Sequence, residues 1–482
     1  MVKDKKNISQ SMLIDIAVYA LWCLYVLIVS GCDMHLLTPV KTVFLILGFA
    51  GLSFFLIKKA GKDKQQVILA VITVAAVGVR TFYVLYTGAE QRQHDMGEFD
   101  TYLENNYHAE YIEYLLENHK LLGEDITEHW QFYHPPLHHI ICALFFSVYR
   151  TILPSAAHNW DALQTLSLLY SLITLSVLRK FTDIFEITFK GKVAAFAVCA
   201  LHPQLIVFSG ALNNDPLATM FAITALLLAW LWYDNRKTYL LFLTSLCIGL
   251  GMMSKLSAGL IAIPIAYLML KVFIGSQSKL KTVLQYLLFL IICAPLGLWY
   301  QVRSLVLWNV PITYVAVPDT NYNPGLLITD VPFWKRFIDL DGSKSYNIIS
   351  ETMNEAVFDG DYYRDNTVLA LLGFFLLASA FVLTAVALAG MITAWLRKRD
   401  DLNTYLTILV AAELVSYVIF CFRYPYTCTM SFRYIVPVII AGGYWCGTAR
   451  DKGPHLLQLF GDAVCYVFAV FSLVFYLMVW IK

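Results

Sequence analysis

The sequence predicts an all-α polytopic membrane protein with about thirteen transmembrane helices. Hydrophobic residues occupy 59% of its 482 positions, and charged residues occupy only 14%. The mean hydropathy of +0.63 is far above that of ordinary soluble domains. The apolar residues form runs, and Lys and Arg stand in short clusters between them, which is typical of membrane helices joined by loops.

The first predicted span follows a basic start at Lys3, Lys5 and Lys6 and has no small-residue cleavage site. This pattern indicates a membrane helix and not a cleaved signal peptide. The later spans are the other apolar runs of the chain. The predicted spans lie at residues 11–30, 40–57, 67–87, 161–178, 193–210, 216–233, 239–253, 257–273, 283–307, 368–396, 404–422, 435–447 and 457–481.

Basic residues concentrate in cytoplasmic loops and therefore predict the orientation. The cluster from Lys58 to Lys64 places the loop after the second span inside, so that the loop containing Asp95 is outside. The later basic clusters agree only if residues 137–153 do not cross the membrane. Apolar residues follow helical spacing there, whereas His138 and His139 are polar, which favours an interfacial helix on the outer leaflet. The alternative is a true span, with one other assignment wrong.

This orientation predicts an integral plasma membrane protein with a cytoplasmic N-terminus and an external C-terminus. We expect a membrane module at residues 1–308 that includes an external loop at 88–160, a second external loop at 309–366, and C-terminal helices at 367–482.

A formal net charge of +1 without a basic patch excludes a nucleic-acid partner. The ten cysteines contain no CxxC pair and are expected to serve as small packing residues.

The stretch QHDMGEFD, at residues 93–100, follows the third span and places His94, Asp95, Glu98 and Asp100 beside the membrane boundary. Carboxylates at such a position can act as a base, bind a metal ion or hydrogen-bond the loop. The other acids of this external segment are expected to form a solvated, negatively charged surface. They are Glu104, Glu110, Glu113, Glu117, Glu124 and Glu128.

Further motifs place polar side chains at predicted outer boundaries. FYHPPLHH carries His134 before a rigid Pro-Pro turn at the start of the interfacial helix, and a helix N-terminus favours anions. SGALNNDPLA carries Asn214 and Asp215 before a span, although the same pattern is an ordinary helix N-cap. MMSKLSAG and WYQVRS carry Lys255 and Arg303, although cations at span ends also snorkel to lipid head groups.

In their order and sidedness these motifs resemble the GT-C class of integral-membrane glycosyltransferases, particularly the bacterial relatives of protein O-mannosyltransferases and of the lipid A aminoarabinose transferase. The resemblance covers most of residues 1–300 and implies the GT-C fold with interfacial helices in the first external loop. It rests on the acidic motif at 94–98, HPPL at 134–137, the loop 213–215, the Ser254-Lys255 pair, residues 299–303 and the later SFRYIVP at 431–437.

The resemblance implies a polyprenyl-phosphate-linked sugar donor, an external protein or glycan acceptor, and inversion at the anomeric carbon of a hexose or pentose. Asp95 would be the general base that accepts the proton of the attacking hydroxyl, with Glu98 as a second catalytic carboxylate. Cations must hold the charge of the departing phosphate. The implied phosphate ligands are Lys255, Arg303 and Arg433, with Arg423 weaker. The implied substrate-binding residues are His94, His134, Asn214 and Asp215.

One departure concerns the phosphate site, because relatives usually carry an arginine early in the span after the interfacial helix and Gln164 stands there. The chain has no HExxH or other specific metal spacing, so we expect no cofactor and metal-independent chemistry. A divalent ion held by histidines and acids of the first external segment is the alternative.

Two other functions compete with a transferase. A transporter or lipid flippase tends to place charges or helix breaks near the bilayer midplane, whereas the charges here gather at the outer rim. A receptor-like or scaffold protein is the third class.

Glu413 lies within an apolar span and is expected to be protonated or hydrogen-bonded inside the bundle. Aromatic residues of the second external loop are expected mainly to pack it onto the interface: Tyr314, Tyr322, Trp334, Tyr346, Tyr362 and Tyr363.

Overall fold

The structure of this protein is a computed structural model that describes residues 7–101, 106–318, 325–328, 333–337, 347–358, 364–397 and 400–480. Within these ranges the chain is almost entirely helical, as predicted, and a lone β-bridge pairs Leu327 with Tyr426. The chain divides into two compact units. Unit 1 comprises residues 1–186 and 205–314, and unit 2 comprises residues 187–204 and 315–482.

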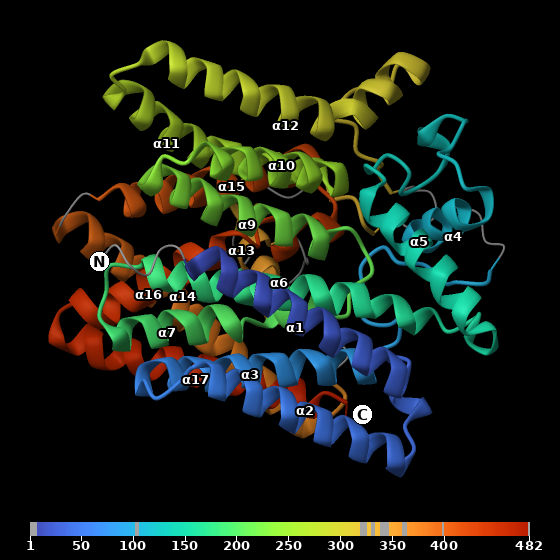
Figure 1. Cartoon of the computed structure of the whole chain (residues 1–482), viewed down its shortest axis with the longest axis horizontal. Helices are drawn as coiled ribbons and strands as arrows, with labels where there is room; N and C mark the ends of the chain where they lie inside the picture. Colours follow the sequence, from blue (N-terminus) through green and yellow to red (C-terminus); the bar gives the residue numbers. More distant parts are fainter. Residues whose placement is uncertain are drawn as a thin grey trace. The chain divides into compact units, whose positions relative to one another are not determined.

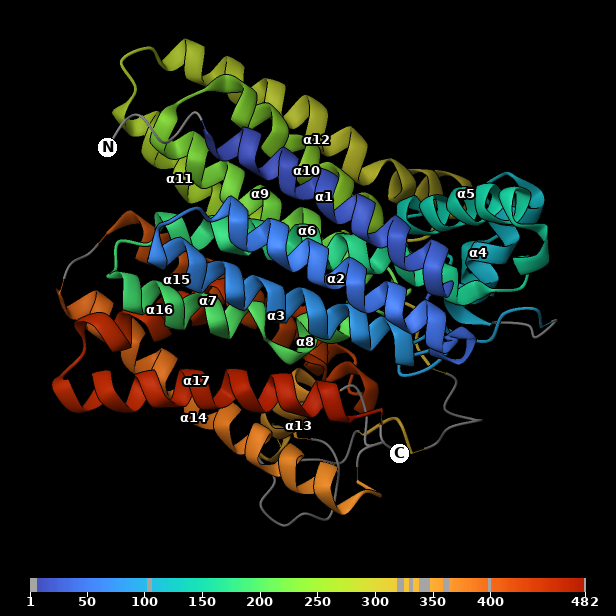
Figure 2. The ribbon, with the colours of Figure 1, turned by 60° about the horizontal axis from the view of Figure 1, so that its bottom comes forward.

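Unit 1 is built around α6, most of whose residues are buried and which contacts α1, α3 and α9. The helix α9 packs on α10, and α10 packs on α12. The shorter α4 and α5 lie side by side at one end of this bundle (Figures 1 and 2). Its helices are α1 (Asn7–Ser30), α2 (Pro39–Lys59), α3 (Lys64–Tyr86), α4 (Tyr107–Asn118), α5 (Leu137–Ile152), α6 (Gln164–Ile184), α9 (Asp215–Asn235), α10 (Thr238–Ser254), α11 (Ala262–Gly275) and α12 (Lys279–Trp308).

Unit 2 is built around α16, which contacts four other helices: α7, α14, α15 and α17. Small residues let these helices approach closely, as is common between membrane helices. One polar contact fixes the packing, because the indole Nε1 of Trp445 donates to Asn403 Oδ1 at 2.8 Å. The helices of unit 2 are α7 (Phe189–Ala200), α13 (Ile348–Val357), α14 (Thr367–Arg397), α15 (Asp401–Arg423), α16 (Val438–Lys452) and α17 (His455–Met478). The short α8 (Pro203–Val207) follows α7.

Ten helices of the described chain are long and apolar enough to span a membrane, which makes this an integral membrane protein. The expected count of thirteen is not confirmed. The predicted span at 193–210 is divided, because Pro203 cannot continue α7, which has 12 residues. The other two, α10 and α16, have 17 and 15 residues. The ten are α1, α2, α3, α6, α9, α11, α12, α14, α15 and α17.

The helix α5 has 16 residues and is not among the ten spans. Leu144, Val148 and Ile152 form an exposed apolar stripe at a spacing of four residues. Its opposite face buries His138 and His139 against the rest of unit 1. A short helix with one exposed apolar face has the form expected of an interfacial helix.

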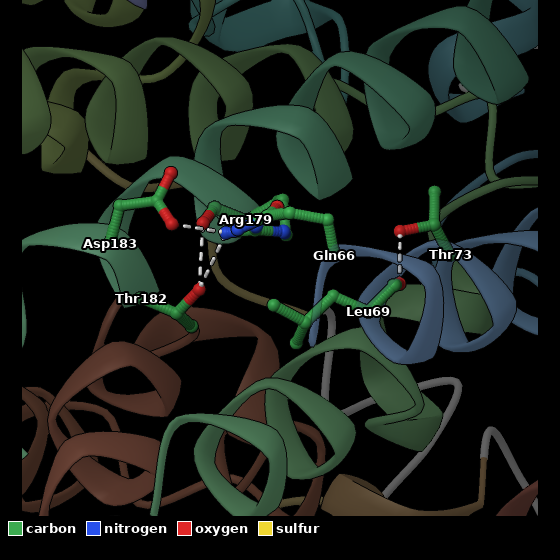
Figure 3. A network of polar contacts seen from close by, with 6 residues as sticks. All are labelled: Gln66, Leu69, Thr73, Arg179, Thr182 and Asp183. Carbon is green, nitrogen blue, oxygen red and sulfur yellow. Dashed lines mark hydrogen bonds and ion pairs between the residues drawn. The ribbon is translucent and has the colours of Figure 1, made fainter. Parts of the chain in front are cut away.

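At the end of α3 and α6 that is remote from α4 and α5, a polar network joins the two helices (Figure 3). Arg179 Nη2 donates to Gln66 Oε1 at 2.7 Å, and Arg179 Nη1 contacts Asp183 at 2.6 Å and Thr182 at 3.2 Å. The long arginine thus links α3 to the last turns of α6. This end carries basic residues, and its location on the cytoplasmic side stays a prediction.

Substitution of Gly390 tests the close packing of α14 on α16. A Cβ atom at Gly390 would lie 1.9 Å from the carbonyl oxygen of Trp445, whereas a Cβ at Gly442 would meet nothing within 4 Å. We expect Gly390→Ala to lower the thermal unfolding midpoint in detergent, although alanine favours the helix. The matched control Gly442→Ala should keep or raise the midpoint. Equal midpoints for the two variants would contradict the packing.

Candidate active site

The predicted functional motifs of unit 1 meet at one end of the bundle. Asn214, at the start of α9, donates through Nδ2 to the carbonyl oxygen of Ser254, at the end of α10, at 2.9 Å. Tyr300 of α12 donates to the carbonyl oxygen of Phe132. The amide of Ala89 donates to Asp161 Oδ1 at 2.7 Å. The described residues of the external segment therefore contact the turn at the start of α6 and the end of α12, and the first turn of α9 meets the end of α10.

The backbone of Asp95 is held in a defined, uncommon conformation. Its φ of +56° is in the left-handed region, which Asp tolerates better than most residues. The amides of His108 and Ala109 donate to the carbonyl oxygens of Asp95 and Met96 at 3.2 and 2.8 Å. Met96 is also buried. The two hydrogen bonds from α4 and the burial of Met96 therefore fix the backbone at the half-buried Asp95.

Gly97 allows this turn to close on Asn106. Its φ is +77°, and a Cβ at this position would lie 2.2 Å from the carbonyl oxygen of Asn106. Asn106 Oδ1 accepts the amide of Glu98 at 2.9 Å. The side chain of Glu98 is exposed on the same turn, and His94 is half-buried before it.

Several acids of this segment bind backbone amides. Glu113 accepts the amide of Asp100 at 2.7 Å, and Glu110 accepts the amide of Asn106 at 2.8 Å and also pairs with His129. The expectation of a merely solvated surface is therefore wrong for Glu110 and Glu113. It holds for the exposed residues Glu117, Glu124 and Glu128, and Glu104 lies outside the described residues.

Asp215 and Lys255 form an ion pair at the junction of α9 and α10. Lys255 Nζ donates to Asp215 Oδ1, and the side chains are 13% and 4% exposed. Asn213 Oδ1 accepts the amide of Asp215 at 3.1 Å, which helps to start α9. The sequence assigned Lys255 to phosphate and Asp215 to substrate, whereas the structure joins them, so each offsets the charge of the other.

The predicted phosphate ligand Arg303 contacts the external segment directly. Its Nη2 donates to the carbonyl oxygen of Leu122 at 2.6 Å, and its guanidinium lies 4.7 Å from the ring centroid of Trp308. Its Nη1 is buried with no hydrogen-bond partner among the described residues. Arg433 belongs to unit 2, where it is buried and its Nη2 donates to Tyr434 at 3.1 Å.

Three buried histidines of α4 and α5, namely His108, His138 and His139, lie close together, with the half-buried His134 beside them. His108 Nδ1 lies 2.8 Å from His139 Nε2, and the rings of His108 and His134 stack at 5.8 Å. His138 Nε2 lies 2.5 Å from the carbonyl oxygen of Leu212, and burial lowers the pKa of His138 to about 4. Within the described ranges no group of three or more His, Cys, Asp or Glu side chains is placed to hold a metal ion.

Two glutamines were missed as contributors to this site. Gln93 Oε1 accepts the amide of Leu212 at 2.5 Å, and Gln164 Nε2 donates to the carbonyl oxygen of Gly210 at 3.0 Å. The departure at Gln164 thus has a structural role in fixing a loop. Neutral amide side chains carry no charge or spacing signal, so nothing in the sequence distinguished Gln93 from other glutamines.

Residues 133–299 match the family model of dolichyl-phosphate-mannose-protein mannosyltransferases. The matched range begins before α5 and ends in α12, and it contains His134, Asp215 and Lys255 but not Asp95. This match confirms the resemblance to protein O-mannosyltransferases and supports a membrane glycosyltransferase. No curated protein matches the chain.

The chain is similar to several solved structures at low identity. ArnT from Cupriavidus metallidurans, bound to undecaprenyl phosphate, is 14% identical with a TM-score of 0.46, and the alignment covers 86% of this chain and 76% of ArnT. The Archaeoglobus fulgidus oligosaccharyltransferase complex with Zn and sulfate is 15% identical with a TM-score of 0.47, covering 85% of this chain and 53% of that one. AglB from Archaeoglobus fulgidus, with an inhibitory peptide and a dolichol-phosphate, is 13% identical with a TM-score of 0.47, covering 86% and 55%. This chain spans about half the length of the two archaeal chains.

The ion pair predicts strong coupling between Asp215 and Lys255. Lys255→Met removes the cation beside a buried carboxylate and should cost about 3–5 kcal/mol of unfolding free energy. In an Asp215→Asn background the same change should cost much less, because no buried charge is left. Denaturant unfolding of the four proteins in one detergent measures this cycle. An equal cost of Lys255→Met in both backgrounds would show that the pair is not coupled.

Glu113 predicts a pH-dependent stability. Burial raises the pKa of Glu113 to about 7, above its ordinary value of 4.5, so the folded state binds this proton more tightly. The resulting stabilisation is full below pH 4.5 and is lost as the pH rises through 7. We expect Glu113→Gln, which keeps an acceptor for Asp100, to flatten the fall of the thermal midpoint between pH 5 and 7.5. The exposed control Glu128→Gln should retain the wild-type slope, because Glu128 does not contribute to the raised pKa of Glu113. A wild-type slope in Glu113→Gln would exclude this carboxyl as the cause.

Proposed function

We propose that this protein is a GT-C glycosyltransferase that moves a sugar from a polyprenyl-phosphate-linked donor to a hydroxyl acceptor on the external face. The match of residues 133–299 to the mannosyltransferase family supports the reaction class. The family description names a lipid-phosphate-linked sugar, which supports the donor class. The clustering of acidic and basic motif residues at one end of unit 1 supports a site at the membrane boundary.

The conformation of Asp95 is the observation that carries the proposed mechanism. Asp95 has a φ of +56°, and α4 fixes its backbone through one hydrogen bond to Asp95 and one to Met96, at the boundary of the predicted third span. A hydroxyl is a poor nucleophile until a base accepts its proton. Preorganisation of such a base lowers the entropic cost of the reaction.

The proposed step is a single displacement. The Asp95 carboxylate accepts the proton of the acceptor hydroxyl while the hydroxyl oxygen forms a bond to the anomeric carbon. The bond from this carbon to the phosphate oxygen breaks, and its electron pair leaves with the polyprenyl phosphate. Attack opposite the leaving group inverts the anomeric configuration. The exposed Glu98 and the half-buried His94 are proposed to contact the acceptor.

The departing phosphate carries negative charge that the site must stabilise. Arg303 is the proposed cation of unit 1, since its buried Nη1 has no partner among the described residues. Lys255 is proposed to act together with Asp215, as a pair whose net charge is small. His134 and Asn214 are proposed to line the donor side. The assignment of Arg433 to phosphate stays a prediction.

Loss of the base is the direct test. In matched detergent, Asp95→Asn should reduce release of polyprenyl phosphate from a panel of polyprenyl-phosphate sugars, with hydroxyl acceptors present, by about a hundredfold or more. Donor binding should persist, because the amide keeps the size of the side chain. Exposed Glu117→Gln is the control and should keep wild-type turnover. Wild-type activity in Asp95→Asn would remove Asp95 as the base, and the absence of wild-type turnover with every donor would favour a transporter or lipid flippase.

A further inference from the structure

The loop before α9 is held by side chains from three different parts of unit 1. Gln164 Nε2 donates to the carbonyl oxygen of Gly210 at 3.0 Å, and Ser167 Oγ, also from α6, donates to that of Ala211. The next residue, Leu212, has both of its backbone polar groups bound by side chains. Its amide donates to Gln93 Oε1, and its carbonyl oxygen lies 2.5 Å from His138 Nε2.

The two side chains on Leu212 have opposite hydrogen-bonding roles. Gln93 supplies an acceptor, and its Nε2 also donates to the carbonyl oxygen of Ala89, which orients the amide. His138 must donate from Nε2, because a carbonyl oxygen can only accept. Its Nδ1 is buried with no hydrogen-bond partner among the described residues, which suits a neutral ring protonated at Nε2.

Leu212 links the two charged parts of the candidate site. Gln93 precedes Asp95 by two residues, and Leu212 precedes Asp215 by three. The stretches 93–95 and 212–215 are short, and each is fixed at its far end, because α4 binds the backbone of Asp95 and Lys255 binds Asp215. The hydrogen bond between Gln93 and Leu212 therefore connects the segment of the proposed base to the segment of the ion pair.

We propose that Gln93 is a positioning residue, which fixes the position of Asp95 relative to the Asp215–Lys255 pair through its hydrogen bond to the backbone of Leu212. His138 binds the other backbone polar group of Leu212, its carbonyl oxygen. The catalytic meaning of this connection rests on the proposed function, whereas the connection itself does not. A shift of a base by about 1 Å can reduce a rate by about a hundredfold. Loss of Gln93 should therefore affect turnover more than donor binding.

Exchange of amide hydrogens tests the connection without any assay of activity. Gln93→Met keeps the length of the side chain but removes both hydrogen bonds. Measured by hydrogen–deuterium exchange and mass spectrometry, it should raise exchange in peptides covering both 90–97 and 209–216. The control Gln91→Met, at an exposed neighbouring position, should leave both peptides unchanged. Faster exchange in only one of the two peptides, or in neither, would overturn the proposal.

Kinetics then test the positioning role. Gln93→Met should lower kcat by about tenfold or more while the donor KM stays within about twofold. His138→Gln, which keeps a donor for Leu212, should retain most of the activity that His138→Leu loses. Coupled exchange with an inactive wild type would refute the proposed function but not the connection. Wild-type kcat in Gln93→Met would refute the positioning role.

Discussion

The candidate site depends on satisfying the backbone of residues 210–212 in a buried loop between membrane helices. An unpaired peptide group in such surroundings costs several kcal/mol, so each needs a partner from another element. The partners are Gln164 and Ser167 of α6, His138 of α5 and Gln93 of the acidic segment. The same bonds that satisfy this loop therefore bring the start of α9, with Asp215, to the segment that carries Asp95.

The external segment uses its acids in the same way. Glu110 and Glu113 accept the backbone amides of Asn106 and Asp100, which precede α4 and therefore are not paired within a helix. Carboxylates that bind backbone amides build a rigid frame for this segment, and the backbone of Asp95 is fixed in it because its carbonyl oxygen accepts the amide of His108. In the proposed reaction, a base with a fixed backbone would lower the entropic cost of aligning the reacting atoms.

Hydropathy predicted the helical fold and most spans, because burial in a bilayer demands long apolar runs. It did not predict that the run at 193–210 is divided near Pro203. The predicted spans at 239–253 and 435–447 are helices, α10 and α16, but they have only 17 and 15 residues. Charged motif residues were recognised because charge at a span end is conspicuous. The union of Asp215 with Lys255 and the role of Gln93 depend on tertiary packing, which leaves no local pattern.

The most direct test of the central claim is the anomeric configuration of the product. Purified protein would be incubated with a polyprenyl-phosphate sugar labelled with ¹³C at the anomeric carbon and with a hydroxyl acceptor. Nuclear magnetic resonance of the product then gives the one-bond carbon–hydrogen coupling at this carbon. A single displacement assisted by Asp95 predicts a glycoside whose configuration is opposite to that of the donor. Retention of the configuration, or donor that stays unreacted with every acceptor, would contradict the account.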